Sequence, residues 1–190
     1  SFHEAMKRIE SRLTTGGPKD RPRLLLLLAD CQVQLNQLDQ TKETLVLLDP
    51  RSAPSQFFLV RGQYQKRKGE KSLAEKDFQQ CLRTSDNLEE KVESLCELAL
   101  LQTENEESEQ LWSQALEQAS SGEIPTQTWT RLYRTRYEIL IEAGKPQAAL
   151  DFCRLMRRGL KERSDLRGLV WAYLAEIDSL KRLNRFEEAE

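Results

Sequence analysis

The sequence has few of the side chains from which metal centres and catalytic sites are built. It holds one histidine, His3, and four cysteines, with no CxxC pair. Zinc sites need several such ligands at close spacing, so the sequence argues against bound metal. Cys31, Cys81, Cys96 and Cys153 are therefore expected to be buried, reduced thiols. No catalytic constellation and no cofactor are predicted, and reduced thiols favour a cytoplasmic location.

Long apolar runs are also absent. The longest, Leu24–Leu28, is far shorter than the ~20 residues that a bilayer-spanning helix needs. The opening SFHEAMKRIE lacks the apolar centre and cleavage site of a signal peptide. No insertion into a membrane is expected.

Glycine and proline are scarce, with 8 and 6 residues in 190. Leu, Glu, Gln, Lys, Arg and Ala dominate, and these residues favour helix over strand. The sequence therefore predicts an all-α protein.

A short pattern recurs along the chain. The closing RFEEAE resembles the opening SFHEAM, and four further segments keep the same phase. A small residue marks each copy, and we call it the anchor. The anchors are Ala5, Thr41, Ala74, Ser108, Ala149 and Ala189, separated by 36, 33, 34, 41 and 40 residues.

Apolar residues recur four and seven positions after the anchors. This spacing puts them in one stripe along a helix, which we call the B helix of each unit. The stripe consists of Ile9, Leu45, Phe78, Trp112 and Cys153, followed by Arg12, Leu48, Cys81, Ala115 and Met156, of which all but Arg12 are apolar or thiol side chains. Five residues before each anchor a tight turn is expected, because Asn and Gly there tolerate a left-handed conformation. These positions are Asn36, Gly69, Thr103, Gly144 and Asn184.

An A helix is expected upstream of each turn. Its larger apolar residue is Leu25, Phe58, Val92, Tyr133 or Tyr173. Twelve residues before the anchor, the first three A helices carry Ala29, Gly62 and Cys96, small enough for a close helix contact, whereas the later ones carry Tyr137 and Ile177.

This arrangement resembles the tetratricopeptide repeat (TPR) family, whose 34-residue unit has the pattern W-x2-L-G-x2-Y, A-x3-F and P. The best match places Phe58, Gly62, Gly69, Ala74, Phe78 and Cys81 at the signature positions. The last two units, with longer periods, look like the variants found in bacterial regulators and kinesin light chains. The resemblance implies a right-handed α-solenoid of stacked antiparallel helix-turn-helix units.

The predicted solenoid segment covers residues 1–190. Residues 1–15 form the B helix of a preceding unit, followed by repeats at 22–50, 55–86, 88–120, 128–163 and 166–190, the last truncated. We expect the chain to be a fragment of a larger protein. Residues 119–128 are the clearest loop by composition.

The family geometry implies that certain A-helix positions line a concave, partner-binding wall. They are Gln63, Lys66, Glu90, Glu93, Glu97, Arg131, Arg134, Glu138, Trp171 and Asp178. Residues 86–123 carry eleven acidic residues against one base. Glu90, Glu93 and Glu97 share one helical face, so they favour a partner protein or peptide with a basic segment, unless that face is only solvated.

Three functions fit these features. The first is a non-catalytic protein-interaction scaffold. The second is the sensor or linker region of a multidomain, bacterial-type signalling or transcriptional regulator. The third is the docking arm of an enzyme whose catalytic domain lies outside this chain.

Other binding functions are disfavoured. Nucleic acid is not an expected partner, because the net charge is −2 and the central wall is acidic. The basic run Arg154, Arg157, Arg158, Lys161 and Arg163 is predicted to decorate the outer surface. The Lys and Asn clamp with which some relatives hold a chaperone tail is missing.

Overall fold

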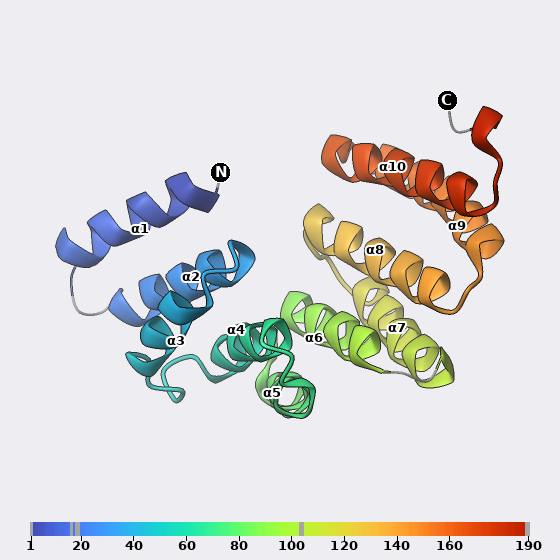
Figure 1. The fold of residues 1–190 in the computed structure, drawn as a ribbon. Helices are drawn as coiled ribbons and strands as arrows, with labels where there is room; N and C mark the ends of the chain where they lie inside the picture. Colours follow the sequence, from blue (N-terminus) through green and yellow to red (C-terminus); the bar gives the residue numbers. More distant parts are fainter. Residues whose placement is uncertain (1, 16, 18–19, 103–104, 189–190) are drawn as a thin grey trace. The chain divides into compact units, whose positions relative to one another are not determined.

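The computed structural model describes residues 2–15, 17, 20–102 and 105–188. Within these ranges the chain forms ten α-helices and one 3₁₀ turn, and no strand (Figure 1). The all-α prediction is confirmed. No helix in the described part is both long and apolar enough to cross a membrane.

The chain divides into two compact units, Ser1–Ser94 and Leu95–Glu190. The first contains α1 (Phe2–Thr15), α2 (Arg21–Gln34), α3 (Leu38–Val46), α4 (Pro54–Arg67), α5 (Lys71–Thr84) and the beginning of α6 (Leu88–Leu101). The second contains the rest of α6, α7 (Asn105–Ser120), α8 (Thr126–Glu142), α9 (Pro146–Glu162), α10 (Leu166–Arg182) and the 3₁₀ turn η1 (Phe186–Glu188).

Helices pack mainly on their neighbours in sequence. In the first unit α1 packs on α2, α2 on α3 and α4 on α5, and the A helices α2 and α4 also meet. In the second unit α9 packs on both α8 and α10, and the A helices α8 and α10 also meet. Connections of three residues, as between α4 and α5, α8 and α9, and α9 and α10, make these paired helices antiparallel.

The predicted B-helix stripe forms the centre of each packed pair. Ala74, Phe78 and Cys81 of α5 have no exposed surface. In α9, Ala149 and Cys153 are likewise 0% exposed. The exception is α1, where Arg12 is exposed and Ile9 only half-buried. Spacing of four and seven residues therefore identified the buried face correctly in α5 and α9.

The turns before the B helices adopt the predicted left-handed conformation. Asn36, Gly69, Gly144 and Asn184 have φ between 58° and 79°, while Thr103 lies outside the described residues. At each of these turns, the next N–H donates to the carbonyl five residues back, as Lys145 does to Leu140 at 2.9 Å. The same motif ends α9 at Ser164, with φ 55°. Sequence patterning missed that position because serine is not a typical left-handed residue.

The predicted loop at residues 119–128 is too long. Helix α7 continues to Ser120 and α8 begins at Thr126, so the connection covers only residues 121–125. Ser and Thr are common at helix ends as well as in loops, which is why composition placed the boundaries too far apart.

The first prediction concerns the close contact between α4 and α5. A Cβ atom added at Gly62 would lie 2.7 Å from Cε1 of Phe78, whose ring is fully buried. Overpacking a buried contact lowers the free energy of unfolding by about 1–3 kcal/mol. Replacing glycine by alanine within a helix normally raises it by about 1 kcal/mol, so the two effects oppose each other. We expect Gly62→Ala to lower the urea midpoint, and Gly62→Ala with Phe78→Leu to recover part of the loss. An unchanged midpoint in the single variant would show that the contact is not tight.

The second prediction concerns the left-handed turns. Nothing lies within 4 Å of a Cβ atom added at Gly144, so only its φ of 68° opposes a side chain there. Gly144→Ala should cost about 1 kcal/mol of unfolding free energy, and Ser164→Gly should be neutral or stabilising. Thermal melts of both variants test this, and destabilisation by Ser164→Gly would contradict it.

Candidate partner-binding surface

The ten predicted binding residues all lie on A helices. Gln63 and Lys66 are on α4, and Glu90, Glu93 and Glu97 are on α6. Arg131, Arg134 and Glu138 are on α8, and Trp171 and Asp178 are on α10.

Two of these residues do not face solvent. Gln63 and Glu90 are each only 7% exposed. Glu90 lies in the first turn of α6, where its Oε2 accepts a hydrogen bond from the Ser85 hydroxyl at 2.5 Å. Its charge is thus used to hold the connection between α5 and α6. The prediction that Gln63 and Glu90 are partner-facing side chains is therefore corrected. Lys66 and Glu93, two other predicted residues on these helices, are half-buried.

Glu97 is held by an arginine of the next A helix. Arg131 Nη1 of α8 donates to Glu97 Oε1 of α6 at 2.9 Å. The carboxylate side chain is 12% exposed and the arginine side chain 30%. In the predicted acidic face of Glu90, Glu93 and Glu97, the carboxylates of Glu90 and Glu97 are thus already bonded internally.

An arginine and two aromatic rings meet where α8 packs on α10. The Arg134 guanidinium lies 5.2 Å from the centroid of the Trp171 ring. Tyr137 packs edge-on against the same ring, with centroids 5.4 Å apart and planes at 90°. Arg134 is exposed and Trp171 half-buried, so one side of the indole is open to solvent.

Asp178 fixes the other end of this group. Its Oδ2 accepts hydrogen bonds from the Tyr137 hydroxyl and from Arg182 Nε, both at 2.7 Å. Burial alone would raise the pKa of Asp178, but the bonds from Arg182 and Tyr137 outweigh it and lower that pKa. Burial, and next the bond to Asp178, raise the pKa of Tyr137. The tyrosine therefore stays a donor and Asp178 an ionised acceptor at neutral pH.

We call this region the α8–α10 surface, made of Arg131, Arg134, Tyr137, Glu138, Trp171, Asp178 and Arg182. The sequence predicted most of these positions, but it treated Tyr137 only as an exception to the small residue expected twelve residues before the anchor. The size of this side chain was a usable signal, since a large aromatic at that position must meet the next A helix.

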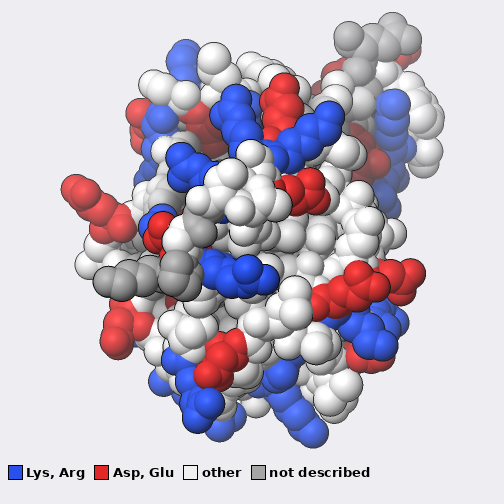
Figure 2. Space-filling view, turned by 90° about the vertical axis from the view of Figure 1, so that its left-hand side faces the viewer, with Lys and Arg blue, Asp and Glu red and all other residues white. Residues whose placement is uncertain are grey.

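On the face drawn in Figure 2 the charged groups are mixed. Figure 2 views the side on which α1 lies in Figure 1, and Lys and Arg side chains are interspersed there with Asp and Glu. Charges on that face are therefore not segregated by sign.

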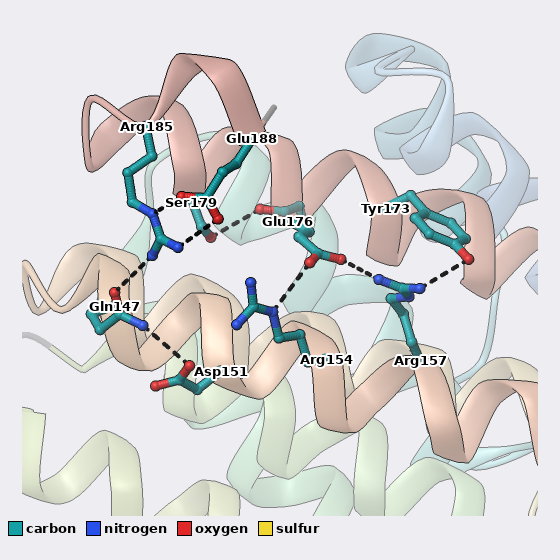
Figure 3. Close-up of polar contacts among 10 residues, drawn as sticks. Gln147, Asp151, Arg154, Arg157, Tyr173, Glu176, Ser179, Arg185 and Glu188 are labelled. Atoms are coloured by element: carbon teal, nitrogen blue, oxygen red, sulfur yellow. Dashed lines mark hydrogen bonds and ion pairs between the residues drawn. The ribbon is translucent and has the colours of Figure 1, made fainter. Parts of the chain in front are cut away.

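The basic run of α9 does more than decorate a surface. Arg154 Nε and Arg157 Nη1 donate to Glu176 of α10 at 3.3 and 2.6 Å (Figure 3). The Arg157 guanidinium also lies 4.1 Å from the Tyr173 ring centroid. These two arginines join α9 to α10, although Arg154 is exposed and Arg157 only half-buried. Arg158 remains exposed.

The cysteines lack the properties of nucleophiles. All four are free and buried. Burial is the main cause that raises the pKa of Cys81 to about 11 and of Cys153 to about 12. Very little thiolate forms at neutral pH under these conditions. Among the residues that the structure describes, no three His, Cys, Asp or Glu side chains are grouped so as to hold a metal ion.

Comparison with known proteins gives a structural likeness. No protein-family model matches the sequence, and no curated protein matches it. Among solved structures, the chain is similar to the crystal structure of BtubC (BKLC) from P. vanneervenii, with a TM-score of 0.64 and 15% sequence identity. The match covers 99% of this chain and 85% of that one. At this identity the likeness concerns the fold alone.

Proposed function

We propose that the protein is a non-catalytic scaffold that binds a partner protein or peptide on its A helices. The helices would be stacked as a right-handed solenoid of TPR-like units. The principal contact would be the α8–α10 surface. The observation that carries this proposal is the Trp171 ring, which is only partly buried and contacts both Arg134 and Tyr137.

Recurring contacts between A helices support the repeat arrangement. Arg131 stands eighteen residues before its anchor and meets Glu97, which stands eleven before the preceding anchor. Trp171, also eighteen before its anchor, meets Arg134 and Tyr137, which stand fifteen and twelve before the preceding one. In both cases the residue eighteen before the anchor thus meets the preceding A helix, which is consistent with units stacked by one repeated rotation.

The chemistry of the surface suits protein recognition. Trp, Tyr and Arg are the residues that most often dominate binding energy at interfaces. Here their geometry is fixed before binding, because Asp178 holds Tyr137 and Arg182 in place. Preorganised side chains lose less entropy when a partner binds.

The charges suggest which segment would bind. Glu97 and Asp178 already accept hydrogen bonds from arginines, whereas Arg134 is exposed beside the indole. The α8–α10 surface therefore suits a segment with an apolar side chain for Trp171 and a carboxylate for Arg134. A partner segment with a carboxylate differs from the basic segment that was predicted from the acidic face of α6. In that face, Glu90 is engaged in an internal contact.

The third prediction tests this surface. A partner captured with the intact parent chain and identified by mass spectrometry supplies the peptide for calorimetric titration. Arg134→Glu should weaken binding about tenfold or more, because it removes the exposed cation beside Trp171. Circular dichroism should show unchanged helicity.

Arg158→Glu is the matched control, with the same charge reversal at an exposed position of α9. It should leave the affinity within about twofold. Equal effects of the two substitutions would mean that only net charge matters. Tighter binding by Arg134→Glu would favour the basic segment instead. Either result contradicts the proposed surface.

A further inference from the structure

An open cavity of about 530 Å³ lies in the second unit. It is bounded by the end of α7, the connection 121–125, the first turn of α8 and the residue that follows α9. Pockets of about 300–1,000 Å³ are the ones that usually hold small molecules. None of the residues that line the cavity belongs to the α8–α10 surface, so the cavity is a separate candidate site.

Trp129 forms one wall of this cavity, and its neighbours fix its position. Its ring centroid lies 6.0 Å from that of Tyr133, whose own ring packs edge-on against Phe152 of α9 at 6.1 Å. Trp129 is only half-buried, which leaves part of the indole open to the cavity. An apolar group can therefore contact the indole without a rearrangement of the helices.

Arg163 lies over the same indole ring. Its guanidinium is 4.3 Å from the ring centroid of Trp129, and its Nη1 donates to the carbonyl oxygen of Gly159 at 3.1 Å. Stacking on an aromatic ring holds a guanidinium in place without using its N–H groups. Nε and Nη2 of Arg163 make no hydrogen bond within the described part of the chain. These two nitrogens offer the fork that binds a carboxylate through two parallel hydrogen bonds.

A carboxylate lines the cavity as well. Glu123 is exposed and, like Arg163, forms no ion pair with any residue that the structure describes. The carbonyl groups at the end of α7 add negative potential, since that helix has no basic residue in its last turn. The cavity therefore presents one cation and one anion that do not neutralise each other.

We propose that this cavity binds a small zwitterion with an apolar side chain, either a free amino acid or a short peptide. The carboxylate of the ligand pairs with Arg163, its ammonium group pairs with Glu123, and its side chain packs against Trp129. An anion alone would bring its charge near Glu123, and a cation alone would bring its charge near Arg163. The two charges together thus select against ligands of a single sign. This site goes beyond the proposed scaffold function and uses other residues, so either proposal can fail alone.

Calorimetric titration of the native chain with leucine and with leucyl-leucine tests the proposal. The tighter of the two should bind with a dissociation constant of about 0.1–1 mM, which is typical of a ligand of this size, and it identifies the source as a free amino acid or a peptide. The N-acetylated form of that ligand lacks the ammonium group, and its carboxamide lacks the carboxylate. Each should bind about tenfold more weakly or worse.

Two neutralising variants assign the charges, and each has a matched control. Arg163→Gln and Glu123→Gln should each weaken binding about tenfold. Arg158→Gln in α9 and Glu142→Gln in α8 change exposed residues that do not line the cavity, and they should stay within about twofold of the native affinity. Circular dichroism should show the same helicity for all four variants.

Three results overturn the proposal. The first is the absence of binding by both ligands up to about 10 mM. The second is an N-acetylated form or a carboxamide that binds as tightly as the zwitterion, since the site would then recognise only one charge. The third is an equal loss of affinity in the cavity variants and their controls.

Discussion

The buried stripe of the B helices is the contact on which the rest of the structure depends. In α9 the stripe of Ala149, Cys153 and Met156 is almost completely removed from water, and the helix packs on both α8 and α10. Because one stripe is covered by two A helices, no single pair of helices contains a complete core. If the units are stacked as we propose, each pair is stabilised by its neighbour.

This sharing of one stripe also positions the side chains that we propose as the partner-binding surface. Helices α8 and α10 are brought together by α9, and their contact sets Trp171 against Arg134 and Tyr137. The ion pairs from Arg154 and Arg157 to Glu176 add charge complementarity to the same packing. The proposed recognition and the stability therefore depend on the same helix register, although Arg134 is exposed and Trp171 is only half-buried.

Local backbone chemistry and periodicity determine the features that could be predicted from the sequence. Asn36 and Gly144 marked left-handed turns, and the small Gly62 marked a close helix contact, because few other residues tolerate those positions. Contacts that depend on which helices pack together in the fold could not be predicted from periodicity or local backbone chemistry. Glu97 appears as one more surface acid until Arg131, 34 residues away, is placed beside it, and Tyr137 gains its role only from Asp178, 41 residues away.

Native-state hydrogen exchange of the second unit, at a concentration where the chain is monomeric, tests the central claim most directly. If helices are stabilised by neighbours on both sides, the interior amides of α9 should be the most protected from exchange. Those of α10, which has an open face, should exchange through local openings of lower free energy. Equal protection of α9 and α10 at the global unfolding free energy would contradict the account, because it would mean that both helices belong to one closed, fully cooperative core.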